Sequence, residues 1–111
     1  MAVVNQYKFV GIDNSTSGSA LTPLGASVPA VNETIVIKSI LATSAGTPTV
    51  TVTNNSITAI KSVALTANQT KELLTQPLIV EGGKTFTIQS STTDSFDVAI
   101  SYLNIKKEVT T

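Results

Sequence analysis

The sequence predicts an all-β fold, an antiparallel β-sandwich of about eight strands, and three observations lead to this class. Val, Ile and Thr together make up 40 of the 111 residues. Apolar and polar residues alternate with a period of two through most of the chain, and no segment keeps a helical period. Turn residues separate these short runs at regular spacing. The pattern leaves two topologies open, a jelly roll and an immunoglobulin-like sandwich.

The expected strands follow one another along a single domain of residues 1–111. In the third strand, Val50 and Val52 alternate with threonines that face outward. Asn54-Asn55 predicts a turn with positive φ, and residues 81–84 predict a tight turn of the hairpin type because they contain two glycines. The strands are expected at 6–12, 34–42, 49–53, 56–65, 70–74, 78–80, 85–90 and 96–106.

Residues 13–30 predict a long loop or arm between the first two strands, because small polar residues and two prolines cannot build a ladder. Leu21, Leu24 and Val28 give this arm apolar anchors. We expect the anchors to dock on a neighbouring subunit. The alternative is that the arm packs on its own chain and covers part of a second apolar face there.

The composition argues against several functions. The chain has no Cys and no His, so it offers no disulfide, no thiolate or imidazole metal ligand and no imidazole base. Seven lysines balance seven carboxylates, which is not the clustered basic charge of a nucleic-acid-binding protein. No secretory signal and no apolar run of membrane-spanning length is visible. We therefore expect no catalytic residue, cofactor or metal, and neither nucleic acid nor membrane as a partner.

Two groups of carboxylates and hydroxyls could argue against this view. The stretch from Asp13 to Gly18 resembles the start of a calcium loop, but Leu24 occupies the twelfth position, where a bidentate Glu is required. Asp94 and Asp97 lie close in sequence, the first in an expected turn and the second on an outward face. We interpret the first group as a flexible polar loop, and in the second we expect Asp94 to hydrogen-bond the backbone of its turn and Asp97 to face solvent.

The strand at 34–42 is apolar on both faces. Ile35, Ile37 and Leu41 fall on one face, and Val36 and Ile40 fall on the other. Apolar residues also occupy both faces at 78–80 and at 100–105. In the second of these segments, the pattern predicts a bulge or twist near Tyr102. A domain of this size has one core, so the second face needs a cover. This predicts a homo-oligomer, with a trimer as the leading state and with Val36 and Ile40 near the contact.

Several segments resemble, in order and spacing, small virion structural proteins of tailed bacteriophages. Those proteins carry the patterns VPA…IVKSI, L-x-AN-x-T-x-ELL, PLVLE-G-D and VDV-x-VSYLE. The corresponding segments here are Val28-Pro29-Ala30 with Ile35-Val36-Ile37-Lys38-Ser39-Ile40, Leu65-Thr66-Ala67-Asn68-Gln69-Thr70 with Glu72-Leu73-Leu74, Pro77-Leu78-Ile79-Val80-Glu81-Gly82 and Phe96-Asp97-Val98-Ala99-Ile100-Ser101-Tyr102-Leu103. The resemblance covers about residues 28–105. Gly83 and Asn104 depart from it, since acidic residues are usual there.

The resemblance implies a non-enzymatic β-sandwich made in the host cytoplasm and carried on the virion. The leading expectation is a capsid decoration protein whose partners are itself and other virion proteins, such as the major capsid protein or a neck or tail protein. A neck or tail collar or fibre component is one alternative. Another is a receptor- or carbohydrate-binding sandwich, which needs exposed aromatics. The chain's aromatics mostly fall at expected core-facing positions, namely Tyr7, Phe9, Phe86, Phe96 and Tyr102.

Overall fold

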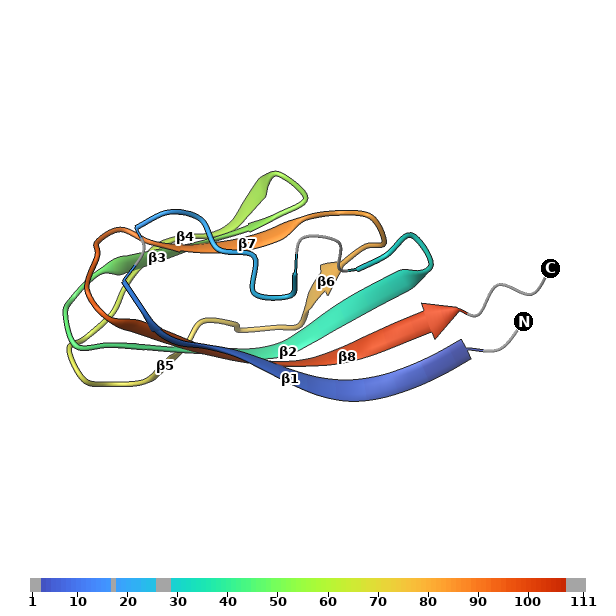
Figure 1. The fold of residues 1–111 in the computed structure, drawn as a ribbon, viewed down its shortest axis with the longest axis horizontal. Helices are drawn as coiled ribbons and strands as arrows, with labels where there is room; N and C mark the ends of the chain where they lie inside the picture. Colours follow the sequence, from blue (N-terminus) through green and yellow to red (C-terminus); the bar gives the residue numbers. More distant parts are fainter. Residues whose placement is uncertain (1–2, 17, 26–28, 108–111) are drawn as a thin grey trace.

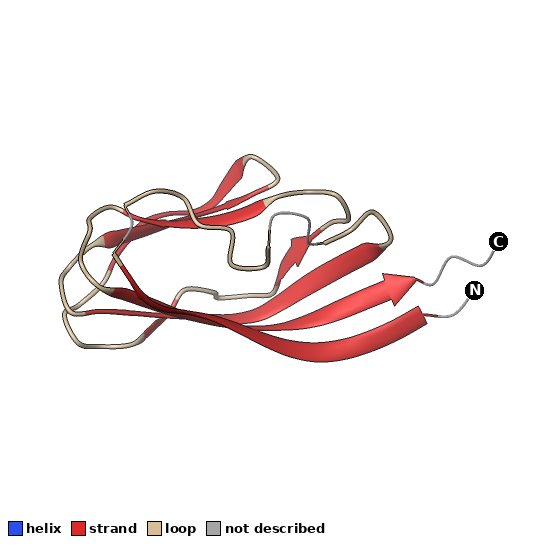
Figure 2. Ribbon diagram, viewed as in Figure 1, coloured by secondary structure: helices blue, strands red, loops and turns tan. Residues whose placement is uncertain are grey.

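Two antiparallel sheets face each other in the computed structural model, which describes residues 3–16, 18–25 and 29–107 (Figure 1). Sheet A has five strands in the order β1-β8-β2-β5, with β6 also paired to β2, and sheet B has the order β4-β3-β7. All regular elements of the described residues are strands (Figure 2), so the predicted all-β sandwich is confirmed. The strands are β1 (Val3–Ser15), β2 (Glu33–Ser44), β3 (Thr49–Asn54), β4 (Ile57–Ala64), β5 (Lys71–Glu72), β6 (Leu78–Val80), β7 (Phe86–Ser90) and β8 (Phe96–Lys107).

The core lies between the two sheets and is mainly aliphatic. Ile35 and Ile37 of sheet A and Val50 and Val52 of sheet B are fully buried in it. Along β8, inward residues alternate strictly with outward ones, as its burial pattern shows. Burial of each large apolar side chain in this core contributes roughly 1.5–3 kcal/mol to the free energy of folding.

The last strand fixes the topology. β8 pairs with both β1 and β2, so it lies in the sheet of the first two strands. In the constant-type immunoglobulin order, the last strand lies in the other sheet, with the strands that correspond to β3 and β7. The strand order of this chain therefore differs from the constant-type immunoglobulin order.

The molecule is elongated, with principal extents of 51 × 22 × 22 Å, because β1, β2 and β8 run on past sheet B (Figure 1).

A β-bulge in β2 decides which residues enter the core. Ile37 pairs with Tyr102 and Ser39 pairs with Ser101, so Lys38 is an extra residue that has no partner residue in β8. The expectation of a bulge or twist in the last strand near Tyr102 is wrong, because β8 alternates regularly through this residue and the extra residue lies in the partner strand β2.

The bulge overturns the expected facing of the residues that follow it. Ile40 is fully buried in the chain's own core, whereas Leu41 is 39% exposed on the outer side. The expectation that Ile40 shares a face with Val36 is wrong. It assumed that side chains alternate strictly between the two faces of the strand, and the extra residue of the bulge shifts this alternation by one.

Two predicted turns form, but one of them connects different elements from those expected. Asn55 (φ 53°) and Ser56 (φ 63°) close the β3–β4 hairpin. At 81–84, the amide of Lys84 donates to the carbonyl of Glu81 over 3.1 Å. However, β6 pairs with β2 in sheet A and β7 pairs with β3 in sheet B. The turn thus joins the two sheets, and the hairpin interpretation is wrong.

The expected arm packs on its own chain. β1 continues to Ser15 through a register shift after Ile12, so the loop begins at residue 16. The amide of Leu21 donates to the carbonyl of Ile88 over 2.8 Å, and Ile88 returns the bond over 3.0 Å. Leu24 is buried in the core and Leu21 packs against it, which contradicts docking of these two anchors on a neighbour. Because they pack in the core between the sheets, they do not supply the expected cover of the second apolar face either. Val28 lies outside the described residues.

Candidate interaction surface

A row of four apolar side chains crosses the outer side of sheet A. Tyr7 of β1 pairs with Leu103 of β8. Leu103 pairs with Val36 of β2, which pairs with Ile79 of β6. Paired residues point to the same side of a sheet, so the four side chains lie side by side. Tyr7 is 81% exposed and Ile79 is 55% exposed, so no described segment covers the two ends of the row.

Three further apolar side chains widen this row. Phe9 is 67% exposed, and Leu41 is exposed opposite Ala99. Ile105 is half-buried opposite Thr34. We call the set the outer apolar face, and it comprises Tyr7, Phe9, Val36, Leu41, Ile79, Leu103 and Ile105.

The exposure of two aromatic residues corrects an expectation. Phe86, Phe96 and Tyr102 are buried, as expected, but Tyr7 and Phe9 are not. The register of β1 explains the difference, because Val10 and Ile12 take the inward positions and pack against the core. Because β1 carries apolar residues on both faces, its sequence alone does not determine which residues point inward.

A shallow hollow of about 470 Å³ lies beside these aromatics. Its lining residues are Tyr7, Lys8, Phe9, Lys38, Ser101 and Tyr102. Lys8 and Lys38 bring two positive charges to this lining, the second from the bulge in β2. A lining of aromatic residues and two lysines suits an uncharged or anionic partner better than a cationic one.

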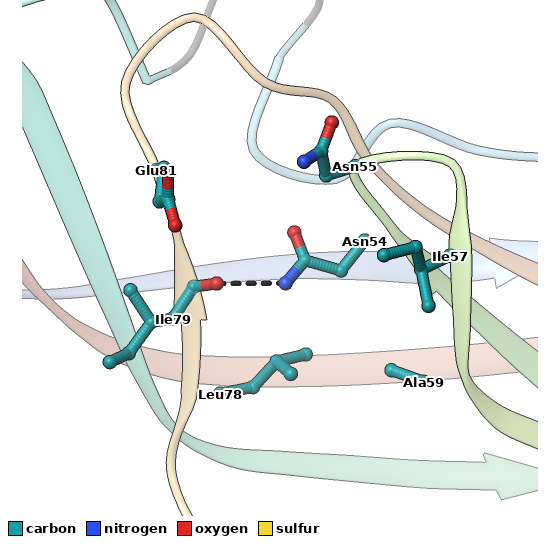
Figure 3. Close-up of a pocket in the computed structure, with 7 residues that line it drawn as sticks. All are labelled: Asn54, Asn55, Ile57, Ala59, Leu78, Ile79 and Glu81. Carbon is teal, nitrogen blue, oxygen red and sulfur yellow. Dashed lines mark hydrogen bonds between the residues drawn. The ribbon is translucent and has the colours of Figure 1, made fainter.

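A second hollow, of about 270 Å³, lies where the β3–β4 hairpin approaches β6 (Figure 3). The side-chain amide of Asn54 donates to the carbonyl of Ile79 over 2.7 Å, and this bond ties sheet B to the edge of sheet A. The Oδ1 atom of Asn54 is buried and accepts no hydrogen bond from the described residues. Glu81 is the one titratable group in the lining, so the hollow offers no acid–base pair. We assign it a structural role.

Glu33 and Asn104 form a polar anchor at the end of sheet A. The Glu33 carboxylate accepts a hydrogen bond from the Ala30 amide over 2.9 Å and one from the Asn104 side chain over 3.1 Å. The bond from Ala30 is the main cause that lowers the pKa of Glu33. Burial raises the pKa of Tyr102, and the nearby charge of Glu33 adds to that rise. This carboxylate is engaged in holding the loop against β2.

Glu72 supports the bulge in β2. Its carboxylate accepts a hydrogen bond from the Ser39 hydroxyl over 2.6 Å and one from the Ile40 amide over 2.7 Å. The side chain thus takes the place of a strand where sheet A is interrupted between β5 and β6. The sequence resemblance includes this glutamate in the segment Glu72-Leu73-Leu74, but its role was not predicted, because that role depends on a bulge in a different strand.

The structure separates the five residues that the sequence proposed for a subunit interface. Leu21, Leu24 and Ile40 belong to the chain's own core region, and Val28 is not described. Val36 lies on the outer apolar face. The doubled apolar pattern of 78–80 and 100–105 did indicate Ile79 and Leu103, whereas Tyr7 and Phe9 were missed.

The described residues hold no cluster of three or more His, Cys, Asp or Glu side chains that could bind a metal ion. Within the same part of the chain, there is no helix long and apolar enough to cross a membrane.

Comparison with known proteins yields a likeness of fold. No family model and no curated protein matches the chain. A solved structure from the study "Bacillus endospore appendages form a novel family of disulfide-linked pili" is similar, with a TM-score of 0.52 and 15% sequence identity. The alignment covers 96% of this chain and 89% of that chain. At this identity, the similarity shows that the two chains share a fold.

Proposed function

We propose that the chain is a non-enzymatic structural protein of a tailed-phage virion, and specifically a capsid decoration protein. The observation that carries the proposal is the outer apolar face. Its row Tyr7–Leu103–Val36–Ile79 spans four strands and is uncovered at both ends. Exposed apolar patches of this kind mark protein–protein contacts.

The size of sheet A is compatible with a specific contact. Three long strands at about 4.8 Å spacing and about ten residues at roughly 3.3 Å each, with the three residues of β6 beside them, give a flat footprint of about 500 Å². Side chains that project from the sheet increase this area. A stable interface buries about 800 Å² on each partner. The outer apolar face therefore offers most of an interface, and we propose that it contacts another copy of the chain or a neighbouring virion protein.

The virion assignment is supported by the sequence resemblance over residues 28–105. The similar fold of a pilus protein supports a role as a building block more generally. The present chain has no cysteine, so the disulfide linkage named for that protein cannot operate here. We expect an assembly of this chain to form through contacts other than disulfides.

Location can be tested directly. Gold-labelled antibodies against the chain should decorate purified phage particles from cells that carry the gene, and labelling of the head rather than the tail is the expected result. Particles without label, together with a virion reconstruction that contains no copy, would refute the proposal. Label confined to the neck or tail would refute the decoration role and retain the virion role.

The surface can be tested with a matched pair of variants. Val36→Lys places a charge in the middle of the outer apolar face, whereas Ile57→Lys places one at a 66% exposed position on sheet B. We expect Val36→Lys to reduce incorporation into particles by at least about tenfold, since a desolvated unpaired charge is costly, and Ile57→Lys to leave it unchanged. Equal incorporation of both variants would remove the outer apolar face from the contact.

A carbohydrate- or receptor-binding module remains the second candidate, because Tyr7 and Phe9 are exposed beside a hollow with two lysines. Exposed aromatic rings supply large contact area for recognition. A Tyr7→Ser/Phe9→Ser variant should then lose retention on a glycan array on which the native chain is retained. Absence of any retention of the native chain would dismiss this candidate.

A further inference from the structure

The edges of the two sheets differ in how well they are protected. A free strand edge presents unpaired N–H and C=O groups, and natural proteins block such edges with irregularities, short strands or covering loops. Three of the four edges among the described residues carry such a device. The fourth edge is β1, the outermost strand of sheet A (Figure 1).

The three protected edges are protected in different ways. β4 carries two register shifts against β3 and has Ser62 at φ 50°. The free side of β7 is occupied by the bridge from Leu21 to Ile88. On the far side of sheet A, β5 and β6 are two and three residues long. None of these edges offers a long regular ladder.

β1 is long and regular by comparison. Residues 3–12 pair with β8 one after another without a register shift. This segment contains no proline, and Lys8 is its one charged residue. Phe9 and Tyr7 project from the outer side of the edge strand, both largely exposed. The ring of Phe9 lies over Gly11, where a Cβ would stand 3.5 Å from its Cε1 and Cζ atoms.

We propose that β1 pairs in antiparallel fashion with β1 of a second copy of this chain, about a two-fold axis at Tyr7 or Phe9. A second β1 is the partner that matches this edge in length, because the other edges are short, irregular or covered. Pairing at Tyr7 or Phe9 brings the aromatic rings of both copies together on one side of the joined sheet. An axis at Lys8 is disfavoured, since it would set two like charges directly opposite each other.

This proposal rests on the proposed function and deepens it. Pairing through β1 joins the two sheets A into one, so the two outer apolar faces become a single surface of twice the area. A two-fold pair closes on itself and does not extend into a fibre. The unit that meets other virion proteins is then a dimer, which differs from the trimer expected from the sequence.

Cysteine crosslinking tests the pairing cleanly, because the chain has no native cysteine. In a two-fold antiparallel pair, the residue on the axis lies opposite itself with Cβ atoms about 4.5–5.5 Å apart, close to disulfide geometry. Single variants Tyr7→Cys, Lys8→Cys and Phe9→Cys are oxidised in parallel, with Lys61→Cys on the exposed edge strand β4 as the control. Circular dichroism verifies that each variant is folded.

We expect Tyr7→Cys or Phe9→Cys to form a disulfide-linked dimer at least about tenfold faster than Lys8→Cys and Lys61→Cys. Crosslinking at neither position above the Lys61→Cys rate would overturn the proposal, as would a maximum at Lys8→Cys. If β1 instead accepts a strand from a different virion protein, the cysteine variants will be protected from a maleimide in particles and fail to crosslink to one another, which also overturns it.

The edge pairing and the proposed function can be refuted separately. Ile79→Cys lies on the outer apolar face but far from β1 across the sheet, and its reaction with a maleimide reports whether that face is covered in particles. Protection at Ile79→Cys without crosslinking in β1 would refute the edge pairing and retain the function. Crosslinking in β1 together with full maleimide reaction at Ile79→Cys in particles would support the edge pairing and refute the role of the outer apolar face in the proposed function.

Discussion

The two faces of sheet A are built from the same strands and from similar residues, yet one is sealed and the other is open. On the inner face, Ile35, Ile40 and Ile100 are completely buried. On the outer face, Tyr7 and Ile79 remain more than half exposed. The apolar content of β2 and β8 thus exceeds what the chain's own core uses. The two faces have similar apolar residues, but only the inner face is covered by the rest of the chain. The outer face is therefore the candidate interface.

The sharpest test of this comparison uses two residues on β8. Ile100→Ala should lower the free energy of unfolding by about 2–5 kcal/mol, because it leaves a cavity in the core. Leu103→Ala, three residues along the same strand but on the outer face, should cost less than about 1 kcal/mol in the free chain. Urea denaturation of the dilute proteins measures both values. Equal losses would mean that the outer face is already covered in the free chain.

The bulge that separates the faces depends on Glu72. Glu72→Ala leaves the Ser39 hydroxyl and the Ile40 amide without their acceptor, so we expect a loss of about 1–3 kcal/mol and faster hydrogen exchange at the Ile40 amide. Glu81→Ala, an exposed glutamate in the turn after β6, is the matched control and should change stability by less than about 0.5 kcal/mol. Unchanged exchange at Ile40 in the Glu72 variant would show that the bulge holds without this support.

The smallest effect concerns the polar end of the inner face. The pKa of Glu33 is lowered in the folded chain, so its contribution to stability is present above the unfolded pKa of about 4.3 and is lost as the pH falls through the lower folded value. Glu33→Gln should therefore weaken the loss of stability between about pH 5 and pH 3, by less than about 1 kcal/mol. Thermal unfolding across this range measures the slope. An identical slope in the variant would contradict the assignment.

The sequence predicted the strands well because alternation and turn residues are local signals. All eight expected strands are present, and Asn55 takes the positive φ expected of its turn. The doubled apolar pattern around Val36 correctly indicated a second apolar face. These features depend on residues close together in the chain.

What the sequence did not predict depends on pairing between distant segments. The extra residue at Lys38 becomes visible when β2 is aligned with β8, and it reverses the facing of Ile40 and Leu41. The assignment of β6 and β7 to different sheets, and the role of Glu72 at the bulge, likewise require the tertiary arrangement. The expected inward facing of Tyr7 and Phe9 is wrong because β1 carries apolar residues on both faces, and only its pairing with β8 decides which set is inward.

The chain's two tyrosines allow the most direct test of the central claim, that the outer apolar face is covered in the assembled state. Tyr7 is 81% exposed and lies on that face, whereas Tyr102 is 9% exposed and lies on the inner face. Iodination followed by mass spectrometry should modify Tyr7 and spare Tyr102 in the free chain. In the assembled protein, we expect Tyr7 to be protected by at least about tenfold while an exposed site outside the face, Lys61, stays reactive to acylation. Equal iodination of Tyr7 in the free and assembled states would contradict the account.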